Sequence, residues 1–117
     1  LPLPGQFELD PGERGMVLIA GIPGVAVHTT VGLPDPGGSD PGDTYIIYNA
    51  DFPGHPLGNG QAITIDCSGL SASGGHGTAQ ILNGANVNGS LPAGEAVTLI
   101  YGGDPAQGGA GWLGIGL

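Results

Sequence analysis

Glycine and proline set the strongest limit on what this chain can fold into. Its 117 residues include 26 glycines and 11 prolines, about a third of the total. The longest stretch that lacks both is Asp43–Phe52, ten residues long, whereas a stable helix usually needs about 12 residues without such breakers. The sequence therefore predicts short extended segments joined by tight turns, and it almost excludes helix.

The apolar content nevertheless indicates a folded domain. Leu, Ile, Val and Phe make up about a quarter of the residues, and disordered chains typically fall below about a fifth. We expect an extended N-terminal arm over residues 1–14 and a single domain over residues 15–117. The core should be thin, and Cys67 is the only cysteine, so no internal disulfide can reinforce it. We therefore expect an obligate homo-oligomer.

The charge is strongly one-sided. Ten carboxylates stand against one basic residue, Arg14, for a formal net charge of −9. This balance argues against binding to nucleic acid, which needs Lys and Arg at the phosphates, and against an anionic membrane surface. No apolar run approaches the roughly 18 residues of a membrane span, and no leader pattern opens the chain. Leu1 is not a residue before which an initiator Met is normally removed, so we expect a processed chain or a domain of a longer one.

Short apolar segments between the turns predict about eight strands. The continuous run Met16–Ala20 is typical of a strand buried on both faces. Gln61–Cys67 alternates, with Ile63, Ile65 and Cys67 on one face. The other candidates are Val25–Val31, Thr44–Asn49, Thr78–Leu82, Ala85–Val87, Ala96–Tyr101 and Trp112–Leu117. Strands about 8–15 residues apart favour an antiparallel β-sandwich or jelly roll.

Few residues suggest metal chemistry. Asp35, Asp40 and Asp43 lie in one loop, and Ca²⁺ prefers such oxygen ligands. The spacing matches no EF-hand, and Asp-Pro-Gly is also an ordinary turn sequence, so both readings stay open. The three histidines, His28, His55 and His76, share no metal-ligand spacing.

Catalysis is not expected, and neither is a cofactor. Cys67 is predicted to be a small core residue rather than a nucleophile. Glycosidases usually line their cleft with several aromatic residues, and this chain has six in all. Trp112 with Tyr101 could stack a sugar ring, although closing the end of the core is the favoured role for both.

The C-terminal segment resembles a known class of proteins. Ser90–Gly103 (SLPAGEAVTLIYGG) and Gly111–Leu117 (GWLGIGL) are similar to the end of bacteriophage virion β-sandwich domains of the tail-fibre, spike or head-decoration type. Those domains commonly end in a Leu-x-x-Gly-x-x-Val-Thr-Leu-(Val/Ile)-Tyr strand, a Gly/Asp turn and a last strand that begins with Trp. The turn Gly103–Gly111 is longer here. The resemblance covers about 28 residues and is moderately specific.

The resemblance implies a trimeric, non-enzymatic virion structural protein on the particle surface, as a capsid decoration or a tail-fibre or spike knob. Such a protein stabilises the assembly, contacts other virion proteins and could contact a host-surface glycan. Its last strand would present Leu113, Ile115 and Leu117 on one face, with Gly114 and Gly116 leaving the other face bare for a subunit contact. The residues expected at the oligomer interface are Leu1, Leu3, Leu99, Tyr101, Trp112, Leu113, Ile115 and Leu117. The alternative is a carbohydrate-binding module of a secreted or tail-associated protein.

Overall fold

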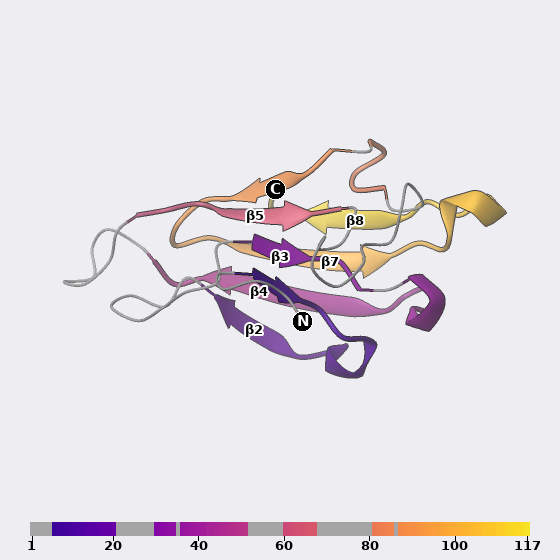
Figure 1. Cartoon of the computed structure of the whole chain (residues 1–117), viewed down its shortest axis with the longest axis horizontal. Helices are drawn as coiled ribbons and strands as arrows, with labels where there is room; N and C mark the ends of the chain where they lie inside the picture. The colour runs from indigo at the N-terminus through magenta and orange to yellow at the C-terminus, as the bar shows by residue number, and fades with distance from the viewer. Residues whose placement is uncertain (1–5, 21–29, 35, 52–59, 68–80, 86) are drawn as a thin grey trace.

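The chain folds into two four-stranded sheets. The computed structural model describes residues 6–20, 30–34, 36–51, 60–67, 81–85 and 87–117 (Figure 1). Sheet A has the strand order β1 (Gln6–Glu8), β3 (Thr30–Gly32), β5 (Ile63–Asp66), β6 (Gly89–Leu91). Sheet B has the order β2 (Val17–Ala20), β4 (Thr44–Asn49), β7 (Ala96–Tyr101), β8 (Trp112–Ile115). The expected all-β fold of about eight short strands is confirmed.

Short 3-10 turns replace longer helices in the described part of the chain. They are η1 (Pro11–Glu13), η2 (Pro36–Gly38) and η4 (Pro105–Gln107). Figure 1 shows all three at one end of the molecule. Each begins at a proline, whose fixed φ suits the first position of a helical turn, and η1 and η2 also contain glycine, which opposes extension. None of the helices among the described residues has the length and hydropathy of a membrane span.

Both sheets are mixed, so the expected antiparallel pairing is wrong for half of the strand pairs. The pairs β1/β3, β3/β5 and β2/β4 are parallel, whereas β4/β7, β5/β6 and β7/β8 are antiparallel. The reason is that strands β1 to β5 alternate between the sheets. A chain that crosses to the other layer and returns can lay its next strand parallel to the earlier one. Strand spacing in the sequence does not distinguish such a crossover from a hairpin.

One hydrophobic cluster is built from the inner faces of both sheets. Alternate residues of each long strand point inward, as Tyr45, Ile47 and Asn49 do in β4. The predicted inward face of Ile63, Ile65 and Cys67 is confirmed. The cluster comprises Leu9, Val31, Leu33, Tyr45, Ile47, Ile63, Ile65, Cys67, Leu82, Leu91, Val97, Leu99, Tyr101 and Trp112.

The N-terminal third differs from expectation in two places. The apolar run at Met16–Ala20 does not form a strand buried on both faces, because β2 is an edge strand of sheet B and Val17 is 62% exposed. Within residues 1–14, assigned to an arm, β1 pairs with β3 and Leu9 is buried in the core. The strand expected at Val25–Val31 is seen only from Thr30 onward, and most of the one expected at Thr78–Leu82 lies outside the described residues.

Candidate functional site: the outer face of sheet B

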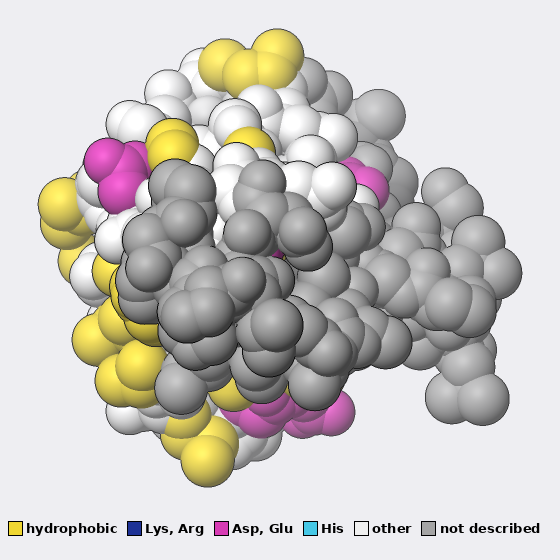
Figure 2. Space-filling model, turned by 90° about the vertical axis from the view of Figure 1, so that its left-hand side faces the viewer, with side chains coloured by type: hydrophobic (Ala, Val, Ile, Leu, Met, Phe, Trp, Pro, Cys, Tyr) yellow, Lys and Arg dark blue, Asp and Glu magenta, His cyan; other side chains and the backbone are white. Residues whose placement is uncertain are grey.

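The outer face of sheet B is mainly apolar, with Thr44 and Thr98 among its aliphatic residues. The strand registers align Val17 with Ile46, Ile46 with Thr98, and Thr98 with Ile115. A second row joins Thr44, Ile100 and Leu113. Val17, Leu113 and Ile115 are each more than half exposed. Figure 2 shows hydrophobic side chains along its left-hand side, with an acidic side chain beside them near the top.

The outer face of sheet A has the opposite character. Its register aligns Thr30 with Thr64 and Thr64 with Ser90. Asp66 also lies at an outward, half-buried position. Polar residues at alternate positions are typical of a strand face in contact with water. The outer face of sheet A therefore suits solvent better than the outer face of sheet B does.

Only part of the predicted oligomer interface lies on this apolar face. Leu113 and Ile115 are exposed on it, whereas Leu1 and Leu3 lie outside the described residues. Leu99, Tyr101 and Trp112 are wrongly placed by the sequence prediction, because their side chains are buried in the core of a single chain.

Leu117 is also separated from Leu113 and Ile115. Strand β8 ends at Ile115, and Gly116 turns the backbone with a φ of 103°. The Leu117 side chain then packs over Gly114, where a β-carbon would lie 2.6 Å from Cδ1 of Leu117. The bare glycine face that was expected to receive another subunit is therefore covered by the same chain.

The edge of β8 is closed by a neighbouring turn. The amide of Trp112 donates to the carbonyl of Ile81 at 2.7 Å, and the amide of Asn83 donates to the carbonyl of Trp112 at 2.9 Å. The Asn83 side chain continues the ladder: Oδ1 accepts from the Gly114 amide at 2.7 Å, and Nδ2 donates to the Gly114 carbonyl at 3.2 Å. Asn83 has a φ of 52° and Gly84 a φ of 79°, as a tight Asn-Gly turn requires.

A shallow groove lies beside the apolar face. It has a volume of about 570 Å³ and is lined by Ile100, Leu113, Asn83 and the glycines at 102, 111 and 114, among others. The groove lies where the β7–β8 hairpin extends beyond the sheet. Backbone bonds between Gly102 and Gly111 continue the pairing into this extension, which ends in η4. Strands β7 and β8 thus pair across the long Gly-rich turn.

Three aromatic residues close one end of the core. The Trp112 ring centroid lies 4.9 Å from that of Tyr101 and 5.6 Å from that of Tyr45. Trp112 is only 1% exposed. Its core role, favoured in the sequence analysis, is confirmed, and its ring is inaccessible for stacking a sugar.

The hydroxyl groups of Tyr45 and Tyr101 are buried without a hydrogen-bond partner. Burial, and secondarily the carboxylate of Asp43, raises the pKa of Tyr45 to about 12. Burial, with a smaller contribution from Asp104, also raises the pKa of Tyr101. Both phenols are therefore neutral at physiological pH.

Asp40 and Asp43, in the loop considered for Ca²⁺, both lie near Arg14. The Nη1 atom of Arg14 lies 3.6 Å from a carboxylate oxygen of Asp40 and 3.6 Å from one of Asp43. Asp43 also accepts a hydrogen bond from the Asp40 amide at 2.9 Å. Asp35 lies outside the described residues. Where the chain is described, no three His, Cys, Asp or Glu side chains form a group that could hold a metal ion.

Residues considered for catalysis do not form a site in the described part of the molecule. Cys67 is buried, and its burial, followed by the negative charge of Asp66, raises the pKa of its thiol. A neutral, enclosed thiol is a poor nucleophile. His28, His55 and His76 lie outside the described residues.

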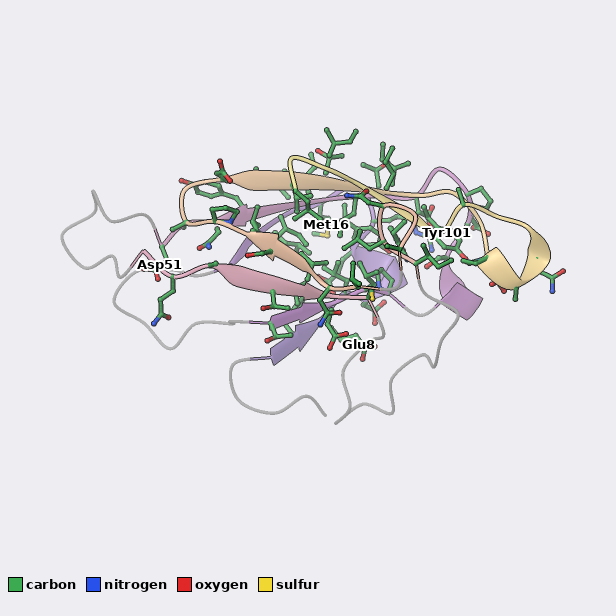
Figure 3. All side chains as sticks on the ribbon, turned by 90° about the horizontal axis from the view of Figure 1, so that it is seen from above. Glu8, Met16, Asp51 and Tyr101 are labelled. Atoms are coloured by element: carbon green, nitrogen blue, oxygen red, sulfur yellow. The ribbon has the colours of Figure 1, made fainter. Side chains whose placement is uncertain are left out.

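A buried polar junction at the other end of the molecule was missed by sequence reasoning. Asn49 is fully buried, and its Nδ2 donates to the carbonyls of Gln61 at 2.8 Å and Leu91 at 3.1 Å. Its Oδ1 accepts from the amide of Asp51, which is itself 2% exposed. The junction ties β4 of sheet B to the ends of β5 and β6 in sheet A. Figure 3 shows Asp51 and Tyr101 near opposite ends of the molecule. The only sequence signal was a polar residue at an inward strand position.

Comparison of the sequence with protein-family models and with curated proteins gives no match.

Proposed function

We propose that this chain is a non-enzymatic structural protein displayed on the surface of a bacteriophage particle, as a capsid decoration or a tail-fibre or spike knob. In this proposal the two sheets form a β-sandwich, and the protein works as a homotrimer that stabilises the assembly and contacts other virion proteins and the host. The C-terminal resemblance supplies the class. The observation that carries the proposal is the contrast between the two outer faces.

The contrast favours assembly because it divides the surface by chemistry. A large exposed apolar patch on a small soluble domain usually marks an interaction site. The polar, acidic remainder of the surface suits contact with water and keeps neighbouring particles apart by charge repulsion. A protein placed in a dense array needs both properties.

The carbohydrate-binding alternative has less support. Sugar-binding sites commonly use an accessible aromatic ring as a stacking platform, and the Trp112 ring is buried. A glycan array probed with the intact chain tests this alternative directly, since binding at micromolar concentration would favour it over a purely structural role.

Particle labelling tests the virion proposal. An antiserum raised against the purified chain, followed by gold-labelled secondary antibody, is applied to phage particles purified on a density gradient. We expect gold on intact particles and the chain among their proteins by mass spectrometry. Recovery of the chain only in fractions without particles would contradict the proposal. A preparation of an unrelated phage provides the matched control.

A further inference from the structure

The outer face of sheet B needs a partner because its exposed apolar residues are contiguous. Val17 is 62% exposed at the β2 edge, and Leu113 and Ile115 are 51% and 55% exposed at the β8 side. Ile46 and Thr98 lie between Val17 and Ile115 in register, and Ile100 lies beside Leu113. Single exposed apolar residues are normal, but a sheet face covered by them is unfavourable in water.

Charge narrows the choice of partner. The strands contribute no carboxylate to the outer face of sheet B. The described acidic residues lie elsewhere, in three groups: Glu8 and Asp66 in sheet A; Asp10, Glu13, Asp40, Asp43 and Asp104 at the 3-10 turns; and Asp51 and Glu95 near the opposite end. The strands of this face therefore offer a basic partner no charge to pair with. A nucleic acid or an anionic membrane would be repelled by the net charge of −9.

A second copy of the chain offers a matching uncharged strand face, and its own net charge of −9 requires that its carboxylates stay outside the contact. Its matching face is also uncharged and apolar, so two copies can bury these faces while their carboxylates stay at the periphery. The face also has an exposed apolar edge and a hollow on opposite sides. Val17 is exposed at β2, and the groove of about 570 Å³ lies beside Leu113, on the far side of the sheet.

We propose that the outer face of sheet B docks a second copy of this chain, with the Val17 edge of one copy seated against the Leu113 groove of the next. A contact between two different patches of one chain is heterologous, and such contacts close into a ring when the rotation between copies allows it. This inference rests on the proposed homotrimer and names the surface that forms it.

The size of the face sets the expected affinity. Four strands about 4.8 Å apart, with up to six residues at about 3.4 Å each, give a footprint of roughly 400 Å². Each partner in a standard interface contributes about 800 Å². Self-association should therefore be weak in dilute solution, at micromolar concentration, and become effective when many copies are held close together on a particle.

Sedimentation velocity at about 1 to 200 μM tests the surface. We expect the wild type to assemble with rising concentration. Leu113→Asp and Ile115→Asp should each raise the dissociation constant by about tenfold or more, since each places a charge in an apolar contact. Thr64→Asp and Ser90→Asp, on the outer face of sheet A, are matched controls and should assemble like the wild type. Circular dichroism confirms that each variant is folded.

Cysteine crosslinking tests the geometry. Val17→Cys chains are mixed with Leu113→Cys chains under mild oxidation. We expect the mixed disulfide to form faster than either homodimeric disulfide. Val17 and Leu113 lie three strand spacings apart in one chain, about 14 Å, too far for a bond within it. The wild type, whose Cys67 is buried, is the control.

The sedimentation and crosslinking results test the docking surface independently of the proposed role in the virion. Wild type that stays monomeric at the highest concentration, or assembly that survives both aspartate substitutions, would overturn the docking surface. Predominant Val17–Val17 or Leu113–Leu113 crosslinks would overturn the edge-to-groove arrangement. Gold labelling of particles is independent of these results, so a labelled particle built from chains that do not associate through sheet B would refute this inference alone.

Discussion

At the scale of single residues, the buried tyrosine hydroxyls carry a measurable cost. Tyr45 and Tyr101 place O–H groups in the core without hydrogen-bond partners. A buried polar group without a partner destabilises the folded state by about 1–3 kcal/mol. The neighbouring Trp112 ring explains why the aromatic rings remain favourable at these positions, because the three rings pack as tilted pairs.

The raised pKa of Tyr45 predicts a loss of stability at alkaline pH. The phenol ionises near pH 10 in the unfolded chain but at about 12 in the folded protein. Between these values the unfolded state has fewer bound protons, so the free energy of unfolding falls as pH rises. We expect a loss of up to about 3 kcal/mol between pH 10 and 12, measured by urea denaturation at several pH values.

Tyr45→Phe is the control for this prediction. Phenylalanine keeps the ring and removes the ionisable, unpartnered hydroxyl. The variant should be as stable as the wild type at pH 7, or more stable, and its stability should fall less steeply above pH 10. An equal alkaline slope in both proteins would show that another group is responsible.

Asn49 is expected to be the polar residue most sensitive to substitution. Asn49→Ala removes two hydrogen bonds from Nδ2 and one to Oδ1, and leaves the carbonyl of Leu91 buried without that donor. We expect a loss of about 3 kcal/mol in the free energy of unfolding. Asn88→Ala is a milder comparison, because exposed Asn88 accepts one hydrogen bond from the Cys67 amide. Equal effects of the two substitutions would contradict the central role of Asn49.

At the scale of elements, the side chain of Asn83 serves as part of a strand. It donates to the carbonyl and accepts from the amide of Gly114, so these two groups at the outer edge of β8 are hydrogen-bonded without another strand. Open edges are sites of unwanted pairing between chains. This arrangement supports the proposal that copies of the chain would dock through the face of sheet B rather than by extension of the sheet at β8.

Asn83→Gly separates the backbone role of this residue from its side-chain role. Glycine tolerates the positive φ of the turn but lacks the amide group. We expect a loss of about 1–2 kcal/mol and faster hydrogen exchange at the Gly114 amide, measured by NMR. Protection of Gly114 equal to that in the wild type would mean that the side-chain pairing is dispensable. The amides of Leu82 and Ala85, each of which donates to the carbonyl of the other residue, should stay protected in both proteins.

The elements were predictable where local pattern decides them. Thr44–Asn49 and Ala96–Tyr101 are strands with the predicted bounds, because each combines β-branched or aromatic residues with flanking turns. β1 and β6 were missed, since three-residue strands such as Gly89–Leu91 have too few residues to show alternation. The parallel pairings were unpredictable for a different reason: they depend on which sheet each strand joins, and that is decided by contacts distant in sequence.

The candidate site was predictable only in part. Alternation along β8 correctly separates Leu113 and Ile115 from Trp112, but Gly116 ends the strand and sends Leu117 to another surface. The pairing of β2 with β4, which extends the apolar face to Val17, could not be inferred from a continuous apolar run.

At the scale of the whole molecule, charge repulsion opposes compactness. The net charge is −9, and the single arginine is already engaged near two carboxylates. Salt screens such repulsion over distances of about 10 Å at 0.1 M. We expect the urea midpoint of unfolding to rise between about 10 mM and 300 mM NaCl, and Arg14→Gln to increase this dependence on salt. A midpoint that falls with added salt would indicate that specific ion pairs outweigh the repulsion.

The alternation of the first five strands between two layers has a consequence for how the molecule folds. Neither sheet is made from one continuous stretch of chain, so neither can form early as an independent unit. Sheet B in particular cannot be completed until β7 and β8 have been synthesised, because β4 pairs with β7. Folding dominated by such distant pairings is slow, typically milliseconds to seconds. A nascent chain that ends before Ala96 would therefore leave open the edge of β4 that pairs with β7, and it would be the species most in need of a chaperone during synthesis.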